Sequence, residues 1–143
     1  MARMVALLRL ILWLACCAAI TSCGQDVPPL LQGVSARGGW YGGCPRPASA
    51  SKEKPALSPE LDQRLRVQFP PGTPASKLST TLVNQGFTIG SPCKEDTSIK
   101  VANYIQKEDG ILLLTRTESS VFWKVHEQEN IVWTQGFVMF IGL

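Results

Sequence analysis

Residues 73–87, TPASKLSTTLVNQGF, decide the fold. The apolar residues of this stretch recur at spacings of three and four, which places them on one stripe of an α-helix: Ala75, Leu78 and Leu82. Pro74 suits the first helical position. Gly86 stands where helices commonly end in a left-handed residue, and Phe87 can close the hydrophobic contact of that cap. The spacing predicts a helix over 74–85 with one buried face.

After this helix the apolar pattern changes to a period of two, which is typical of β-strands. The alternation covers residues 99–105, 121–126 and 131–141. The turn signal Asp109-Gly110 precedes an apolar run at 111–117, which predicts a further strand. Residues 118–120 predict a turn after that strand. Gly136 predicts a bulge or bend in the last strand.

Upstream of residue 73 the helix signals are shorter. Ser58-Pro59-Glu60 combines a capping residue, proline and an acidic first turn, so we expect a helix over 59–66. Val67 and Phe69 then alternate with a polar residue and predict a strand-like fragment. Residues 59–143 therefore predict a small two-layer α+β domain: an antiparallel β-meander of three or four strands packed against one or two helices.

The segment before the domain has a different composition. Between Gly24 and Pro59 the chain carries six glycines and six prolines in 36 residues. Such a composition buries too little surface to offset the entropy of ordering, so residues 23–58 predict a flexible tether. Fully stretched, a tether of this length reaches about 120 Å.

The N-terminus has the three parts of an export signal. Arg3 and Arg9 supply positive charge, and Leu10–Ile20 is an apolar run of 11 residues. This run is shorter than the ~20 residues that a membrane-spanning helix needs. It ends in Ile20-Thr21-Ser22-Cys23, the pattern of a bacterial lipobox. Residues 1–22 are therefore interpreted as a lipoprotein signal peptide, with a lipid anchor on Cys23.

Two other fates of this segment compete. Ordinary signal peptidase could cut after Ala19 or Thr21, which would leave three cysteines in the mature chain. Lipoprotein processing leaves two unmodified cysteines, and an even count suits an oxidising compartment. An uncleaved anchor beginning near Met4 is disfavoured because Arg9 interrupts its apolar run.

Charge and the residue after Cys23 bear on location and partners. Gly24, rather than aspartate, follows the cysteine, which favours the outer membrane. The full chain has 14 basic and 11 acidic residues. Without Arg3 and Arg9 this becomes 12 against 11, a net charge of +1. Such a charge gives no electrostatic footprint for nucleic acid. The lipid on Cys23 predicts the membrane as one partner, and we expect another envelope protein as the second.

Cys44 and Cys93 are the two cysteines that remain. Cys93 lies in the polar stretch GSPCKED, where a partner can reach it, and a disulfide between the two is left open. Trp40-Tyr41, between glycine pairs, is either a short docking motif, an aromatic pair that folds back on the domain, or an idle pair.

Residue types for catalysis and metal binding are sparse. His126 is the only histidine, and its place at a strand end is typical of a surface residue. Two distant cysteines and one histidine form no ligand cluster. No catalytic constellation and no phosphate-binding loop stand out. We expect a protein that is not an enzyme and carries no metal or cofactor.

Aromatic residues in the strands are the remaining functional signal. Phe122 and Trp123 alternate along one strand, so they point to opposite faces of the sheet. Trp133 lies in the next strand. Exposed aromatics on a sheet mark partner sites. Phe122, Trp123 and Trp133 are therefore candidates for partner binding; the alternative is that other elements cover both faces.

Three short strings carry a resemblance: FPPGTP at 69–74, QGF at 85–87, and WKV at 123–125. They resemble a group of small proteobacterial lipoproteins without assigned function. In plan, residues 60–143 are more distantly similar to SmpA/OmlA-type outer-membrane lipoproteins and β-lactamase-inhibitor-like domains. The resemblance implies an export signal, a flexible lead and an α+β domain, usually with two helices before the sheet. It implies no catalytic residues.

The sequence thus predicts a lipid-anchored, non-enzymatic accessory module of the cell envelope that faces the periplasm and binds another envelope protein through its sheet. The alternative is an inhibitor or immunity protein that blocks a hydrolase by inserting a loop, either Gly90–Ser98 or Glu127–Asn130.

Overall fold

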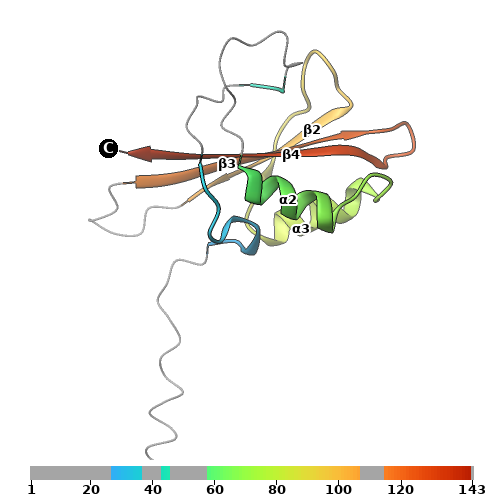
Figure 1. Cartoon of the computed structure of the whole chain (residues 1–143). Coiled ribbons are helices and arrows are strands. Elements are labelled where there is room, and N and C mark those ends of the chain that lie inside the picture. Colours follow the sequence, from blue (N-terminus) through green and yellow to red (C-terminus); the bar gives the residue numbers. More distant parts are fainter. Residues whose placement is uncertain (1–26, 37–42, 46–57, 107–114, 143) are drawn as a thin grey trace, which may run out of the picture.

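The computed structural model describes residues 27–36, 43–45, 58–106 and 115–142. Two helices pack against one face of a four-stranded antiparallel sheet (Figure 1). The elements in chain order are η1 (Pro29–Leu31), α2 (Pro59–Gln68), α3 (Ala75–Asn84), β1 (Thr88–Ile89), β2 (Ile99–Ile105), β3 (Thr115–Val125) and β4 (Ile131–Gly142). The strands are ordered β1-β2-β3-β4, so the predicted α+β meander is confirmed.

Helix α3 ends as its sequence predicts. Gly86 adopts a φ of +84°, the left-handed conformation that glycine reaches without a steric cost. The Phe87 N–H donates a hydrogen bond of 3.0 Å to the Leu82 carbonyl, which satisfies a group that the helix end would leave open. The Phe87 side chain is buried in the core. This cap turns the chain from the helix into β1.

Helix α2 is longer than predicted. It continues to Gln68, and Val67, which was expected in a strand-like fragment, lies in its last turn with 74% of its surface exposed. The Phe69 N–H still donates to the Leu65 carbonyl at 2.8 Å. The strand prediction was wrong because two alternating residues are too few to distinguish a period of two from a helical turn.

Strand β3 is one continuous strand where the sequence predicted a strand, a turn and a second strand. Residues 118–120, the predicted turn, pair with both β2 and β4. Ser119 is buried there, and its hydroxyl donates to the Phe137 carbonyl at 2.9 Å. Serine is thus tolerated in a central strand because its polar atom has a partner. The predicted strand residues 111–114 lie outside the described residues.

Gly136 does not form a bulge. It pairs with Val121 in unbroken register, and the register shift between β3 and β4 falls at Lys124 and Val125 instead. A Cβ atom at Gly136 would lie 2.5 Å from the Leu61 Cγ atom. Glycine is required at this position because helix α2 approaches the β4 backbone so closely.

Residues 27–36 belong to the core, although the sequence placed them in a flexible tether. Leu30 is 1% exposed, and Leu31 is also buried. The Leu30 N–H donates to Gln85 Oε1 at 3.0 Å, and Arg64 Nη1 donates to the Leu30 carbonyl at 2.8 Å. Burying each leucine is worth roughly 1.5–3 kcal/mol. For this segment, the stabilisation from two buried leucines and these polar contacts exceeds the entropy cost of ordering a stretch rich in glycine and proline.

Glu60 ties the far end of the same segment to helix α2. Its carboxylate accepts hydrogen bonds from the Ser35 hydroxyl at 2.8 and 2.9 Å and from the Ser35 N–H at 3.2 Å. The Ser35 hydroxyl is the main reason that the pKa of Glu60 is lowered to about 2, since these bonds favour the charged form. The Ser58 hydroxyl at the start of α2 also donates to this carboxylate.

We expect the Glu60→Gln variant to be less stable than the unchanged chain at pH 7, with the difference shrinking toward pH 2. A carboxylate whose pKa is lower in the folded chain stabilises the fold at pH values above its unfolded pKa, about 4.3. This stabilisation is lost as the pH falls through the folded pKa. Urea unfolding between pH 7 and pH 2 measures both curves. Parallel curves over this range would contradict the role of Glu60.

Two apolar clusters lie on opposite faces of the sheet. The larger joins the helices, residues 30–31 and the inward side chains of the strands, including Trp123. The smaller lies on the other face, which we call the outer face. It contains Cys93, Ile99, Val101, Phe122 and Phe137. The alternation of Phe122 and Trp123 thus sends them to separate clusters, as the period of two predicts.

Candidate binding groove beside a disulfide bond

A disulfide bond joins Cys44 to Cys93 on the outer face of the sheet. The two residues are 49 apart in sequence, with their Cα atoms 5.8 Å apart, a normal separation for a disulfide. It fastens residues 43–45 across the sheet, where Cys44 packs against the outer-face cluster. A disulfide of this kind indicates an oxidising, extracytoplasmic compartment.

The disulfide bond packs against the outer-face cluster. Cys93 is buried, and the rings of Phe122 and Phe137 meet edge to face with their centroids 5.6 Å apart. Such edge contacts add roughly 0.5–1.5 kcal/mol to the burial of the rings. The disulfide therefore rests on a packed surface that β3 and β4 build together.

The loop at residues 90–98 is braced at several points. The Cys93 N–H donates to the Ile99 carbonyl at 3.0 Å, and Asp96 Oδ2 forms an ion pair of 3.0 Å with Lys124 Nζ. The pKa of Asp96 is lowered, chiefly because the Ser98 hydroxyl donates to its carboxylate and secondarily because of Lys124. Hydrogen bonds and a covalent bond thus hold the loop in one conformation.

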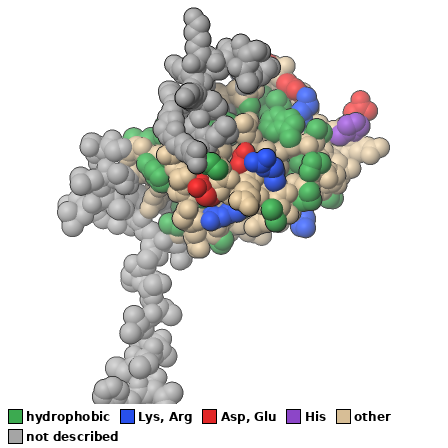
Figure 2. Space-filling model, in the orientation of Figure 1, with side chains coloured by type: hydrophobic (Ala, Val, Ile, Leu, Met, Phe, Trp, Pro, Cys, Tyr) green, Lys and Arg blue, Asp and Glu red, His purple; other side chains and the backbone are tan. Residues whose placement is uncertain are grey.

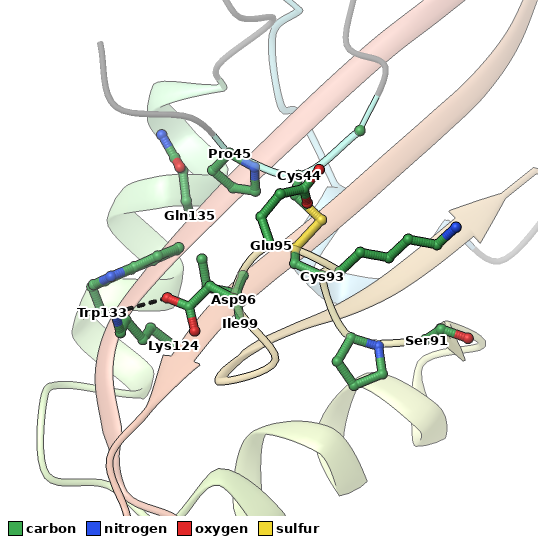
Figure 3. Close-up of a pocket in the computed structure, with 13 residues that line it drawn as sticks. Cys44, Pro45, Ser91, Cys93, Glu95, Asp96, Ile99, Lys124, Trp133 and Gln135 are labelled. Carbon is green, nitrogen blue, oxygen red and sulfur yellow. Dashed lines mark hydrogen bonds and ion pairs between the residues drawn. A yellow bond between two sulfur atoms is a disulfide. The ribbon is translucent and has the colours of Figure 1, made fainter. Parts of the chain in front are cut away.

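A groove of about 900 Å³ opens beside this loop. Figure 3 shows Pro45 and the disulfide on one side and Trp133 on the other, with Asp96 and Lys124 next to Trp133. Ile99 contributes to its apolar lining, and Gln135 adds an amide from β4. An apolar groove with a few polar groups matches the usual composition of binding sites for small molecules or short peptide segments.

Trp133 is half-buried and lies between two hollows. The second hollow, of about 450 Å³, lies between helix α2 and strand β4 and is lined by Arg66, Phe69 and Pro71 among others. Of the three aromatic residues predicted to bind a partner, Trp133 is the one whose side chain is not buried.

Phe122 and Trp123 do not lie at a surface. Each is 3% exposed, Phe122 under the disulfide and Trp123 under the helices. Their assignment to a partner surface is therefore corrected, because a buried ring offers no area to a partner. The Trp123 indole N–H is buried with no hydrogen-bond partner among the described residues. A buried indole N–H usually has a partner, so this one costs free energy that the burial of the ring offsets.

The charged side chains that line the groove are Lys94, Glu95, Asp96 and Lys124. His126 is exposed and follows the end of β3, and no histidine is among the described residues that line the groove. Within the described ranges, no group of three or more histidine, cysteine, aspartate or glutamate side chains could hold a metal ion. Asp96 and Lys124 pair with each other.

Several predicted features lie outside the described residues. Cys23, the proposed lipid anchor, is one, and the aromatic pair Trp40-Tyr41 is another. No helix in the described part of the chain is long and apolar enough to cross a membrane. Comparison with known protein families, curated proteins and solved structures gave no match to this chain.

Proposed function

We propose that this protein is a lipid-anchored, non-enzymatic binding module of the cell envelope, held to the membrane through Cys23 and facing the periplasm. The lipobox pattern at Ile20–Cys23 supports the anchor, with Gly24 favouring the outer membrane. The disulfide between Cys44 and Cys93 supports an oxidising compartment on that side of the membrane.

The groove lined by Trp133 is the observation that carries the binding role. Tryptophan side chains in pockets are enriched among residues that dominate binding energy, because they bury a large rigid surface. Here the disulfide bond holds the side of the groove that faces the ring, so the groove needs little reordering when a partner binds. We infer that an exposed segment of another envelope protein occupies it.

The second candidate function is inhibition of a hydrolase by the loop at residues 90–98. The bracing of this loop by Cys93 and by the pair Asp96–Lys124 favours it, since inhibitory loops bind tightly when they are held rigid beforehand. The loop also lines the groove at residues 91–96, so an exposed loop residue outside this lining, Thr97, distinguishes the two functions. An inhibitor depends on the loop tip, whereas an adaptor depends on Trp133.

Photocrosslinking in intact cells tests the groove. With benzoylphenylalanine at Gln135, beside Trp133, we expect a defined protein adduct that the Trp133→Ala variant reduces at least several-fold. Benzoylphenylalanine at the exposed residue His126 is the matched control and should give no such adduct. Adducts that survive Trp133→Ala unchanged would contradict the groove. Loss on Thr97→Ala instead, at an exposed loop residue that does not line the groove, would favour the inhibitory loop.

A further inference from the structure

We propose that the helical face of the domain lies against the membrane that holds its lipid anchor, and that the groove therefore points away from that membrane. This inference rests on the proposed lipidation of Cys23 and adds the surface that meets the lipid. It follows from three properties of the described residues: the length of the connection, the side on which it arrives, and the charge of that side.

The connection is short. Val27, the first residue that the structure describes, packs against the core, and three residues separate it from Cys23. Four residue steps span at most about 14 Å even when fully extended. A tether that continued to residue 58 would have reached about 120 Å. The hydrogen bonds of Leu30 to Gln85 and Arg64 remove most of that length.

The connection arrives on the helical side. In Figure 1 the segment that begins at residue 27 lies beside α2 and α3, on their side of the sheet, while the disulfide-linked residues lie on the opposite side. Arg64 and Gln85, which bind Leu30, belong to α2 and to the C-terminal cap of α3. An anchor within about 14 Å of Val27 thus brings these helices to the bilayer first.

The exposed side chains of this helical face suit a phospholipid surface. On α2 and α3, which the structure describes in full, the exposed charged residues are Arg66 and Lys77. Val67 and Val83 are exposed there as well, at 74% and 52%. Both acidic residues of α2 have partners: Glu60 binds Ser35, while Asp62 accepts from the Gly136 N–H at 2.7 Å through Oδ1 and pairs with Arg66 at 3.4 Å through Oδ2.

Basic and apolar side chains together favour an anionic headgroup layer, which attracts each lysine or arginine close to its surface. Figure 2 shows basic and apolar side chains near the lower edge of the molecule, together with an acidic one. Two basic residues would not bind a membrane alone. They orient a domain that a lipid already holds there.

Lipid photocrosslinking tests the orientation. The lipidated full-length protein is reconstituted into vesicles of phosphatidylethanolamine and phosphatidylglycerol, with benzoylphenylalanine at Val83 on the helical face or at Asn103 on the outer face. Both positions are exposed. We expect lipid adducts at Val83 and only background at Asn103. Equal labelling, or labelling of Asn103 alone, would overturn the inference.

Two variants separate the causes. An insertion of about 20 glycine and serine residues after Gly24 gives a coil of roughly 25 Å, so the Val83 adducts should fall several-fold. The pair Arg66→Glu and Lys77→Glu should also lower them, whereas the matched control Lys94→Glu, on the outer-face loop, should not. Full Val83 labelling in both the insertion and the charge-reversed variant would overturn the proposed orientation.

The anchor itself has a separate readout. Flotation with the vesicles depends on the lipid at Cys23, and the Cys23→Ala variant should lose it. Failure of the unchanged protein to float would overturn the proposed anchor. Flotation without any difference between Val83 and Asn103 would overturn only the orientation.

Discussion

Replacing Gly136 with alanine is expected to destabilise the domain by about 3 kcal/mol, at the upper end of the usual cost of overpacking a core. The added Cβ would lie 2.5 Å from the Leu61 Cγ atom and 2.6 Å from its Cδ2 atom. Helix α2 cannot simply move away. The Gly136 N–H donates to Asp62, and its carbonyl accepts from the Ser58 N–H at 3.3 Å.

Urea unfolding measures this loss, and a second variant tests its cause. Leu61→Ala alone should cost about 2–5 kcal/mol because it leaves a cavity. If the clash is the cause, the loss of stability in the double variant should be smaller than the sum of the two single losses by about 1 kcal/mol or more.

Gly33→Ala is the matched control for the change from glycine to alanine. Gly33 has a φ of +62° and no atom within 4 Å of a built Cβ. It should therefore cost only about 1 kcal/mol, from backbone strain. A Gly136→Ala protein with an unchanged unfolding midpoint would contradict the close approach of α2.

The sequence predicts the helices and strands well where local signals agree. The cap at Gly86 and Phe87 was predictable because conformation and burial are both local requirements there. The strands β2 and β4 were predictable from alternation. Residues 118–120 were not, because their polar side chains indicate a turn until the partner of Ser119, the Phe137 carbonyl on the neighbouring strand, is known.

The glycine and proline content of the predicted tether gave a wrong prediction for residues 27–36. Glycine and proline content is averaged over a long window, whereas the burial of Leu30 and Leu31 depends on two residues and on contacts more than 30 positions away in the sequence. The paired leucines after Pro28-Pro29 were the available signal. A window of a few residues would have separated them from the rest of the predicted tether.

The candidate site was predictable only in part. The aromatic residues of the strands were the right class, and Trp133 was among them. Sequence alternation assigns Phe122 and Trp133 to faces, but it cannot show that the disulfide-linked residues cover Phe122 and leave Trp133 accessible. That difference depends on the Cys44–Cys93 bond, whose pairing the sequence left open.

Removing the disulfide by Cys44→Ala and Cys93→Ala together is expected to destabilise the folded domain by about 4 kcal/mol, the chain-entropy estimate for a loop of this length. The bond joins residues 49 apart, so its loss frees a long loop in the unfolded chain. It also unfastens residues 43–45 from the outer-face cluster. Urea unfolding of the double variant and of the reduced wild-type chain should give the same midpoint.

The double variant also tests whether the bond shapes the groove. Pro45 and the disulfide form one of its walls, so the adduct from Gln135 should fall in the double variant at temperatures where the domain remains folded. A reducing agent should lower the adduct of the wild-type chain and leave that of the double variant unchanged. An undiminished adduct from a folded double variant would show that Trp133 and β4 suffice for binding. The disulfide would then contribute stability alone, because it closes the loop without forming the surface that a partner contacts.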